Sequence, residues 1–169
     1  MSRSLPWRSL ANLALQLVIL TLLIAAFFMR LPQVSGLSMA PHIASGEYVL
    51  INTFAYRIAQ PKRGDIVAFR RDDDARAVFI KRVIALPGDR IRIDKGVVSI
   101  DGHRLDEPYV RFADDRTFGE IVVPPGSAYV LGDNRADSED SRFFGPVRDE
   151  RLIGRALAGL WPPADVGTL

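Results

Sequence analysis

The 169-residue sequence contains no cysteine and only two histidines. The absence of cysteine excludes disulfide bonds and thiol catalysis, and it is compatible with either redox compartment. The scarcity of histidine leaves few ways to activate a hydroxyl nucleophile. No group of histidine and carboxylate residues has the spacing of metal ligands, so we expect neither a metal nor another cofactor.

An excess of charge of one sign is also missing. The chain has 22 Lys and Arg against 20 Asp and Glu, which gives a net charge of +2. Nucleic-acid-binding domains usually carry a denser basic face, so this balance argues against nucleic acid as a main partner. The length suits one folded domain together with an anchor.

Charged residues are absent from residues 9–29, between Arg8 and Arg30. This run reaches the ~20 residues that a membrane-spanning helix needs, although Asn12 and Gln16 interrupt its first part. A cleaved signal peptide would also have a basic start and an apolar core. We favour a retained anchor, because the run is long for a signal peptide and no small-x-small cleavage pattern follows it.

The charges that flank this run predict its orientation. Arg3, Arg8 and the N-terminal amine precede the span, and Arg30 is the single opposing charge. The positive-inside rule then predicts a cytoplasmic tail, a transmembrane anchor and an extracytoplasmic domain, which are residues 1–8, 9–29 and 30–169. No second run of this length follows.

Short β-rich runs separated by glycine and proline fill the rest of the chain. They predict strands at 47–52, 64–69, 78–86, 91–93, 97–100, 120–123 and 128–131. No long helical pattern follows the anchor. The fold class is therefore predicted to be mainly β, a compact all-β domain preceded by one transmembrane helix. The charged stretches 70–76 and 111–116 are predicted to be solvated loops.

Two residues suit hydrolysis by a serine nucleophile, Ser38 and Lys81. Ser38 lies shortly after the apolar run, and Lys81 lies inside the apolar stretch 78–86. A lysine can serve as a base only where its surroundings disfavour the ammonium form, as apolar neighbours do. Taken singly, the serine is more typical of a turn and the lysine of a strand residue whose charge reaches water.

Four segments in this order strengthen that hypothesis: SGLSMAP at 35–41, RGDIVAF at 63–69, FIKRVIALPGD at 79–89 and GDNRADSEDSRFFGPV at 132–147. Together with the preceding anchor they resemble the bacterial type I signal peptidases, membrane-anchored Ser/Lys proteases of the secretory pathway. The spacer between the last two segments is short, so the chain resembles compact members of the family that lack a large inserted β-domain.

The resemblance implies an endopeptidase that removes signal peptides from exported preproteins after small-x-small sites. It places this activity at the outer face of the bacterial plasma membrane, with the lipid bilayer and the secretion translocon as further partners. It also implies roles for three residues. Ser38 matches the nucleophile, Lys81 the general base, and Ser138 the serine that hydrogen-bonds the lysine nitrogen.

Other matched residues are expected to support these three. Structural ion pairs that hold the Ser138 loop against the Lys81 strand are expected from Arg82, Asp133, Arg135, Asp140 and Arg142. An ionised carboxylate directly beside Lys81 would raise its pKa and oppose the mechanism. Shallow apolar pockets for small substrate residues are expected from Val34, Gly36, Met39, Ile43, Phe79 and Ile80.

Two positions depart from the family pattern. Gly36 stands where many members have a serine whose hydroxyl helps the oxyanion hole, so the donor that acts beside the Ser38 amide is left open. His42 stands where threonine is usual, and it gives a Ser/His alternative. That alternative needs a carboxylate to orient His42, and it leaves Lys81 without a role.

Three other interpretations remain. The chain could be a processing peptidase for a single secretion or conjugation substrate, but the full-length fourth segment favours the general enzyme. It could be a non-catalytic anchored β-domain that binds envelope proteins, but it keeps both Ser38 and Lys81. A soluble self-cleaving repressor-type Ser/Lys domain is disfavoured by the anchor. The oligomeric state is left open.

Overall fold

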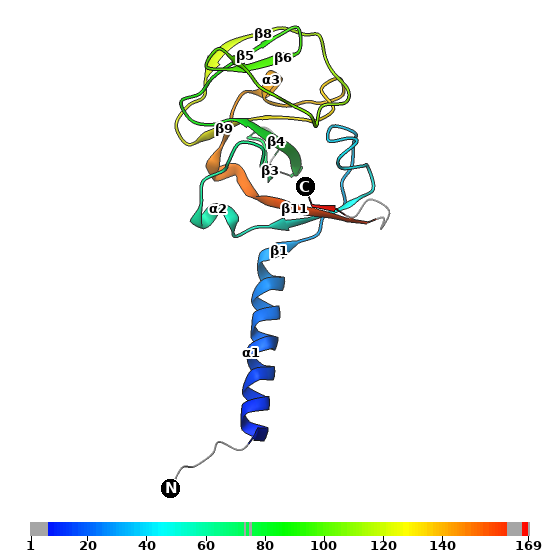
Figure 1. Cartoon of the computed structure of the whole chain (residues 1–169), viewed down its shortest axis with the longest axis vertical. Helices are drawn as coiled ribbons and strands as arrows, with labels where there is room; N and C mark the ends of the chain where they lie inside the picture. Colours follow the sequence, from blue (N-terminus) through cyan, green and yellow to red (C-terminus); the bar gives the residue numbers. More distant parts are fainter. Residues whose placement is uncertain (1–6, 73, 75, 162–166, 169) are drawn as a thin grey trace.

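The computed structural model describes residues 7–72, 74, 76–161 and 167–168. Helix α1 (Trp7–Phe28) extends from the β-rich body as a single stalk (Figure 1). By length and composition its segment Ser9–Phe28 could cross a membrane, and none of its described side chains is buried in the body. The apolar run therefore forms the long helix that the sequence predicts.

The larger sheet carries the site. Its strands in the described residues follow the order β1-β2-β11-β3-β4-β9-β10, with β12 beside β11, and every pairing is antiparallel. Their bounds are β1 (Met29–Arg30), β2 (Tyr48–Asn52), β3 (Ile66–Phe69), β4 (Phe79–Ala85), β9 (Ser127–Leu131), β10 (Val147–Arg148), β11 (Leu152–Trp161) and β12 (Gly167–Thr168).

A smaller antiparallel sheet forms the end of the body far from α1 (Figure 1). Its order is β7-β6-β5-β8, with bounds β5 (Arg90–Asp94), β6 (Val97–Ile100), β7 (His103–Arg104) and β8 (Phe118–Val122). Inward side chains of β5 and β6, such as Ile91 and Val98, pack against Ile84 of β4 and Leu131 of β9. One core cluster thus joins the two sheets.

The helices beyond α1 in the described residues are single turns: α2 (Ala55–Ile58), α3 (Ser141–Phe144) and a 3-10 turn η1 (Asp149–Arg151). The predicted mainly β fold with one N-terminal helix is therefore confirmed. Each of the seven predicted strands overlaps an observed one, namely β2, β3, β4, β5, β6, β8 and β9.

The central strand β11 has no counterpart among the predicted strands. Its sequence holds Gly154 and Gly159, and glycine is depleted in strands. Close packing explains the first of these: a Cβ on Gly154 would lie 2.3 Å from the Asn52 carbonyl oxygen of β2. The strand also shifts register against both β2 and β3. Its glycines are needed for close approach, which hides the strand from pattern analysis.

The predicted loop 111–116 needs a correction. It has no strand in the structure, but it is not solvated throughout, because the Asp114 side chain is only 7% exposed. Asp114 forms ion pairs with Arg116 and with Arg142. The physical reason is long-range charge pairing across 28 residues, which local charge density does not report.

The C-terminal end of α1 is fixed to the body. The hydroxyl and the amide of Thr53 both donate to the Phe28 carbonyl oxygen, at 2.8 and 2.9 Å. The Phe28 and Phe54 rings lie 4.8 Å apart between centroids. Because Thr53 directly follows β2, the helix end has a defined position against the larger sheet.

The tight turn between β5 and β6 packs against the backbone of Asp114, and two glycine substitutions test this contact. Gly96 has φ +77° and a Cβ there would lie 1.7 Å from the Asp114 carbonyl oxygen, whereas Gly102 has φ +79° and open space around it. We expect Gly102→Ala to lose about 1 kcal/mol of unfolding free energy from left-handed strain alone. Gly96→Ala should lose about 2 kcal/mol more, since the backbone of residue 114 must move.

Thermal unfolding of both variants in detergent micelles, followed by circular dichroism, measures the difference. Equal melting temperatures for the two variants would show that Asp114 does not pack on this turn as described.

Candidate active site

Ser38 and Lys81 meet although 43 residues separate them in sequence. Lys81 is on β4, and Ser38 is in the turn that leads from β1 toward β2. Lys81 Nζ lies 2.7 Å from Ser38 Oγ, and it also lies 3.2 Å from the Ile80 carbonyl oxygen. Lys81 is only 4% exposed. A hydroxyl therefore shares a hydrogen bond with an amine that is largely removed from water.

The turn that contains Ser38 is anchored in the hydrophobic core. Met39 and Ile43 are buried and pack against β2 and β3, while the amide of Ile43 donates to the Met39 carbonyl at 3.0 Å. Gly36 has φ +110°, a conformation that side-chain-bearing residues rarely adopt. The glycine that departs from the family pattern is therefore suited to its backbone position.

Asn134 fixes the same turn from the side. Its amide donates to the Ser38 carbonyl at 3.0 Å and its side-chain Nδ2 donates to the Leu37 carbonyl at 3.2 Å. Gly132 permits this approach, since a Cβ there would lie 2.5 Å from the Ser38 carbonyl oxygen and 2.3 Å from Ser138 Oγ. The sequence analysis missed Asn134, although the fourth segment contains it.

Burial sets the charge state of Lys81. Desolvation lowers the pKa of its amine from 10.5 to about 8. The carboxylates of Asp140, Glu139 and Asp133 act in the opposite direction, and Arg142 assists the lowering. Carboxylates thus do lie near Lys81, but the loss of hydration has the larger effect on its pKa.

The five residues expected to form ion pairs lie in three groups near Ser38 and Lys81, around Asp133, Asp140 and Arg135. Asp133 is fully buried and accepts two hydrogen bonds from the Arg82 guanidinium, at 2.8 and 2.6 Å. Arg82 directly follows Lys81 on β4. This pair therefore ties segment 132–142 to the strand that carries the lysine.

The second group is centred on Asp140, which is also fully buried. Arg142 donates to it from Nε at 2.7 Å, and the Gly132 amide donates to it at 3.0 Å. Arg135 pairs with Glu107 at 2.6 Å rather than with a member of the fourth segment. The sequence analysis did not identify Glu107, because nothing in the local pattern around it indicates its distant partner.

A cavity of about 730 Å³ opens beside Ser38 and Lys81, which both line it. Five of the six residues expected at the substrate wall line it, which are Val34, Gly36, Met39, Phe79 and Ile80. Ile43 does not, since it is fully buried in the core cluster that also contains Met39. Asp137 and Glu139 add carboxylates to one side of the cavity.

Comparison with known proteins identifies the family to which this chain belongs. A family model described as signal peptidase, peptidase S26, matches residues 7–161. The chain belongs to this family. The resemblance drawn from the four segments is thereby confirmed, and membership supports the cleavage of signal peptides from preproteins.

Relatives of this signal peptidase family member extend along most of the chain. It is 37% identical over 168 residues to the probable signal peptidase I-2 of Synechocystis sp.. The aligned region covers 96% of this chain and 77% of the relative. It is 35% identical to the signal peptidase I of Leptolyngbya laminosa, with 90% and 78% covered. The crystal structure of a signal peptidase I from Enterococcus faecalis V583 matches with a TM-score of 0.51 and 32% identity, covering 58% of this chain and 97% of that one.

In this signal peptidase family member Ser138 makes a different contact from the one implied by the resemblance. Its Oγ donates to Asp140 Oδ2 at 2.6 Å, and among the described residues no hydrogen bond joins it to Lys81. Ser138 is nevertheless buried. The buried carboxylate of Asp140 is the stronger acceptor, which explains why the hydroxyl points toward it.

His42 has a carboxylate neighbour but does not contact Ser38. Its Nδ1 lies 3.4 Å from Asp133 Oδ2, and its side chain is 39% exposed. Within the described part of the chain His42 forms no hydrogen bond with Ser38, whose hydroxyl is bound to Lys81. The Ser/His alternative therefore lacks the contact between base and nucleophile that it requires.

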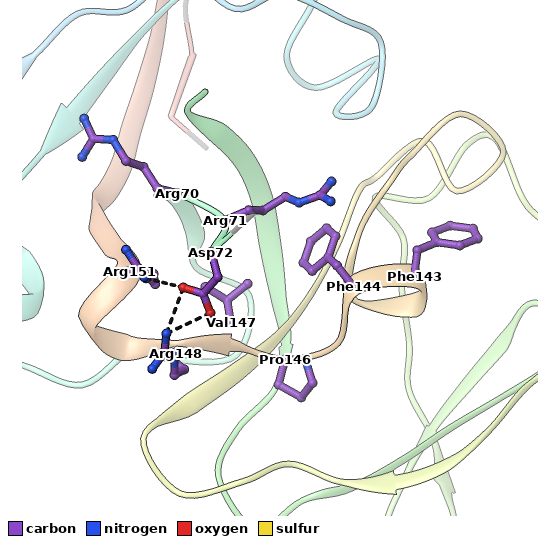
Figure 2. Close-up of a pocket in the computed structure, with 9 residues that line it drawn as sticks. All are labelled: Arg70, Arg71, Asp72, Phe143, Phe144, Pro146, Val147, Arg148 and Arg151. Atoms are coloured by element: carbon purple, nitrogen blue, oxygen red, sulfur yellow. Dashed lines mark hydrogen bonds and ion pairs between the residues drawn. The ribbon is translucent and has the colours of Figure 1, made fainter. Parts of the chain in front are cut away.

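Figure 2 shows a second cavity, of about 380 Å³, with arginine and phenylalanine side chains around it. Asp72 lies between Arg148 and Arg151 there and forms ion pairs with both. The residues that line it include no serine, lysine or histidine, so it offers no nucleophile and base. Elsewhere in the described residues, no three His, Asp or Glu side chains are grouped as a metal site requires.

The lowered pKa of Lys81 predicts a stability effect. Because the folded-state pKa is about 8 and the unfolded one about 10.5, the charged amine destabilises the fold below pH 8. This destabilisation, about 3 kcal/mol, fades as pH rises from 8 to 10.5. Lys81→Met should therefore raise the unfolding free energy at pH 7, and the gain should shrink toward pH 10.

Thermal unfolding at several pH values checks this, with the exposed Lys62→Met as the matched control. A Lys81→Met protein that is less stable than wild type at pH 7 would contradict the burial argument.

Proposed function

We propose that this protein is a Ser/Lys endopeptidase that cleaves the signal peptides of exported preproteins after small-x-small sites. The observation that supports it most directly is the 2.7 Å contact between Ser38 Oγ and the buried Lys81 Nζ beside an apolar cavity. Two residues with no other shared role in the fold are held at the distance that proton transfer requires.

In the proposed reaction the neutral amine of Lys81 takes the proton of Ser38 as Oγ attacks the carbonyl carbon of the scissile bond. The resulting ammonium returns that proton to the leaving amine, which departs as the new N-terminus of the mature protein. A water molecule then attacks the acyl carbon and gives a proton to Lys81. The bond between that carbon and Ser38 Oγ breaks, and Lys81 returns the proton to Oγ. A pKa of about 8 leaves about one tenth of the base neutral at pH 7.

The oxyanion of the tetrahedral intermediate needs hydrogen-bond donors. We assign one to the backbone amide of Ser38, which donates to no other group among the described residues. The amide of Gly36 is less available, because it lies 3.3 Å from the Ser45 hydroxyl.

Specificity for small side chains is assigned to the apolar wall of the cavity. The residues that line it are Val34, Met39, Phe79 and Ile80. Because Met39 is packed into the core, it cannot move aside to enlarge the cavity. A large substrate side chain would have to displace packed groups, whereas alanine would fit. The same apolar wall should favour the apolar residues of a signal peptide over the charged residues of a surface loop.

We further propose a single-pass topology in the bacterial plasma membrane. The proposed parts are a cytoplasmic tail at 1–8, of which residues 1–6 lie outside the described residues, an anchor at 9–29 and an extracytoplasmic peptidase domain at 30–169. Helix α1 ends at Phe28, where Thr53 binds it. Confining enzyme and substrate to one surface reduces the entropic cost of their encounter, and the translocon is a candidate neighbour.

Incubation of the full-length protein with a preprotein bearing an Ala-x-Ala site tests this function. Ser38→Ala and Lys81→Ala should each lower the rate at least about 1000-fold, and the double variant should be little worse, because neither residue acts without the other. The wild-type rate should rise with pH and reach half its maximum near pH 8, as Lys81 loses its proton.

His42→Ala is the matched control and should keep most activity. A preprotein with large residues in place of both alanines should resist cleavage. Near-normal turnover by Lys81→Ala would refute the Ser/Lys assignment.

Ser138→Ala tests the supporting role of this residue. Its hydroxyl donates to Asp140, so its loss leaves the carboxylate less satisfied and more able to stabilise the ammonium form of Lys81. We expect about a tenfold lower kcat with little change in KM, and an acidic limb of the rate profile that moves to higher pH. Rate measurements across pH decide it, with Ser99→Ala, a half-buried serine on β6, as control. An unchanged profile would reduce Ser138 to a loop residue.

A further inference from the structure

The side chain of Arg71 lies behind the wall of the candidate active site. In Figure 2 it extends toward Phe144 and away from Asp72. Its guanidinium carbon lies 4.9 Å from the centre of the Phe144 ring and 5.4 Å from that of Phe79. The side chain is only 15% exposed. Phe79 lines the catalytic cavity on its other side, so Arg71 supports that wall directly.

Arg71 also binds a carboxylate of the catalytic cavity. Its Nη1 forms an ion pair with Glu139 Oε1, from a position 68 residues away in sequence. Glu139 stands between Ser138 and Asp140 and lines the cavity together with Lys81. A carboxylate in this position favours the ammonium form of the lysine.

The other carboxylates that act on Lys81 are arranged in the same way. Asp133 is bound by Arg82 and Asp140 by Arg142, each through short hydrogen bonds. Glu139 with Arg71 completes a set in which each of these three carboxylates is paired with a different arginine. Of the three pairs, only this one has a partner from outside β4 and segment 132–142.

We propose that Arg71 is a positioning residue for the Lys81 base: held between two phenylalanine rings, it binds Glu139 and keeps this carboxylate from stabilising protonated Lys81. The inference rests on the proposed Ser/Lys function, in which only the neutral amine can accept the Ser38 proton. Arginine suits this task better than lysine, because its planar guanidinium stacks on aromatic rings while it donates to a carboxylate.

Loss of Arg71 and loss of the Glu139 charge should affect Lys81 in opposite directions. Arg71→Met removes a cation and frees Glu139, and both changes favour protonated Lys81. Glu139→Gln removes the anion and disfavours it. Because Glu139 is 62% exposed, solvent screens the interaction, and we expect shifts of about half a pH unit in opposite directions. The double variant should return close to the wild-type value.

Direct titration of the lysines measures this without reference to activity. The chain has three lysines, and Lys62 and Lys95 are exposed, so they serve as internal standards. Carbon-13 labelling of the lysine ε-carbons in the full-length protein in micelles gives one resonance each, and Lys81→Met assigns the third. The Lys81 midpoint should rise in Arg71→Met, fall in Glu139→Gln and be restored in the double variant.

Kinetics give the second measurement. The acidic limb of kcat/KM against pH should move with the midpoint, so that Arg71→Met is about threefold slower than wild type below pH 7 and nearly equal above pH 9. Arg71→Lys retains the charge and should restore most of the limb. Arg148→Met is the matched control. Arg148 and Arg71 both line the second cavity, but Arg148 pairs with Asp72, so its loss should leave both measurements unchanged.

Unchanged Lys81 midpoints in both single variants, or shifts in the same direction, would overturn the proposal. A rate that falls equally at every pH would also overturn it, because it would indicate a purely structural role for Arg71. A wild-type protein that cleaves no preprotein would refute the proposed function instead, and the lysine titration would still decide whether Arg71 controls Lys81.

Discussion

The burial of one amine against one hydroxyl is the constraint on which the arrangement of this molecule depends. Lys81 has to lose most of its hydration for its pKa to fall to about 8, so β4 must run through the interior rather than along an edge. Ser38 must then reach the amine from another part of the chain. The turn at 36–43 does so because Met39 and Ile43 anchor it in the core while Asn134 holds it from the side.

A buried lysine close to neutrality is sensitive to every charge around it. Burial alone would lower its pKa further, and Asp133, Glu139 and Asp140 each act against this. Two of these carboxylates are fully buried, yet each accepts hydrogen bonds that a neutral side chain could not replace. Asp133 fixes segment 132–142 on β4 through Arg82, and Asp140 holds the segment together through Gly132, Ser138 and Arg142. This explains their presence so close to an amine whose neutral form they oppose.

The sequence predicts the fold well where the pattern is local. Short β-rich runs ended by glycine and proline identify seven strands, and an uncharged run identifies α1. The central strand β11 escapes, because Gly154 fits a close approach to β2 that no local pattern reports. Ser38 and Lys81 come from the resemblance of whole segments. Their supports Glu107, Asp114 and Arg71 do not, since the choice among many possible charge partners is made by tertiary packing over 28 to 68 residues.

Pairing each carboxylate with an arginine reconciles the two demands on this site. An ionised carboxylate accepts several hydrogen bonds and so holds a loop well, but the same charge favours the protonated form of the neighbouring lysine. A bound guanidinium sets a compensating positive charge beside each carboxylate while it leaves the carboxylate oxygens in place. Buried ion pairs contribute little net stability, because desolvation offsets their attraction. Their value here lies in position and charge balance: they allow acidic residues to line a site whose proposed chemistry requires an uncharged lysine.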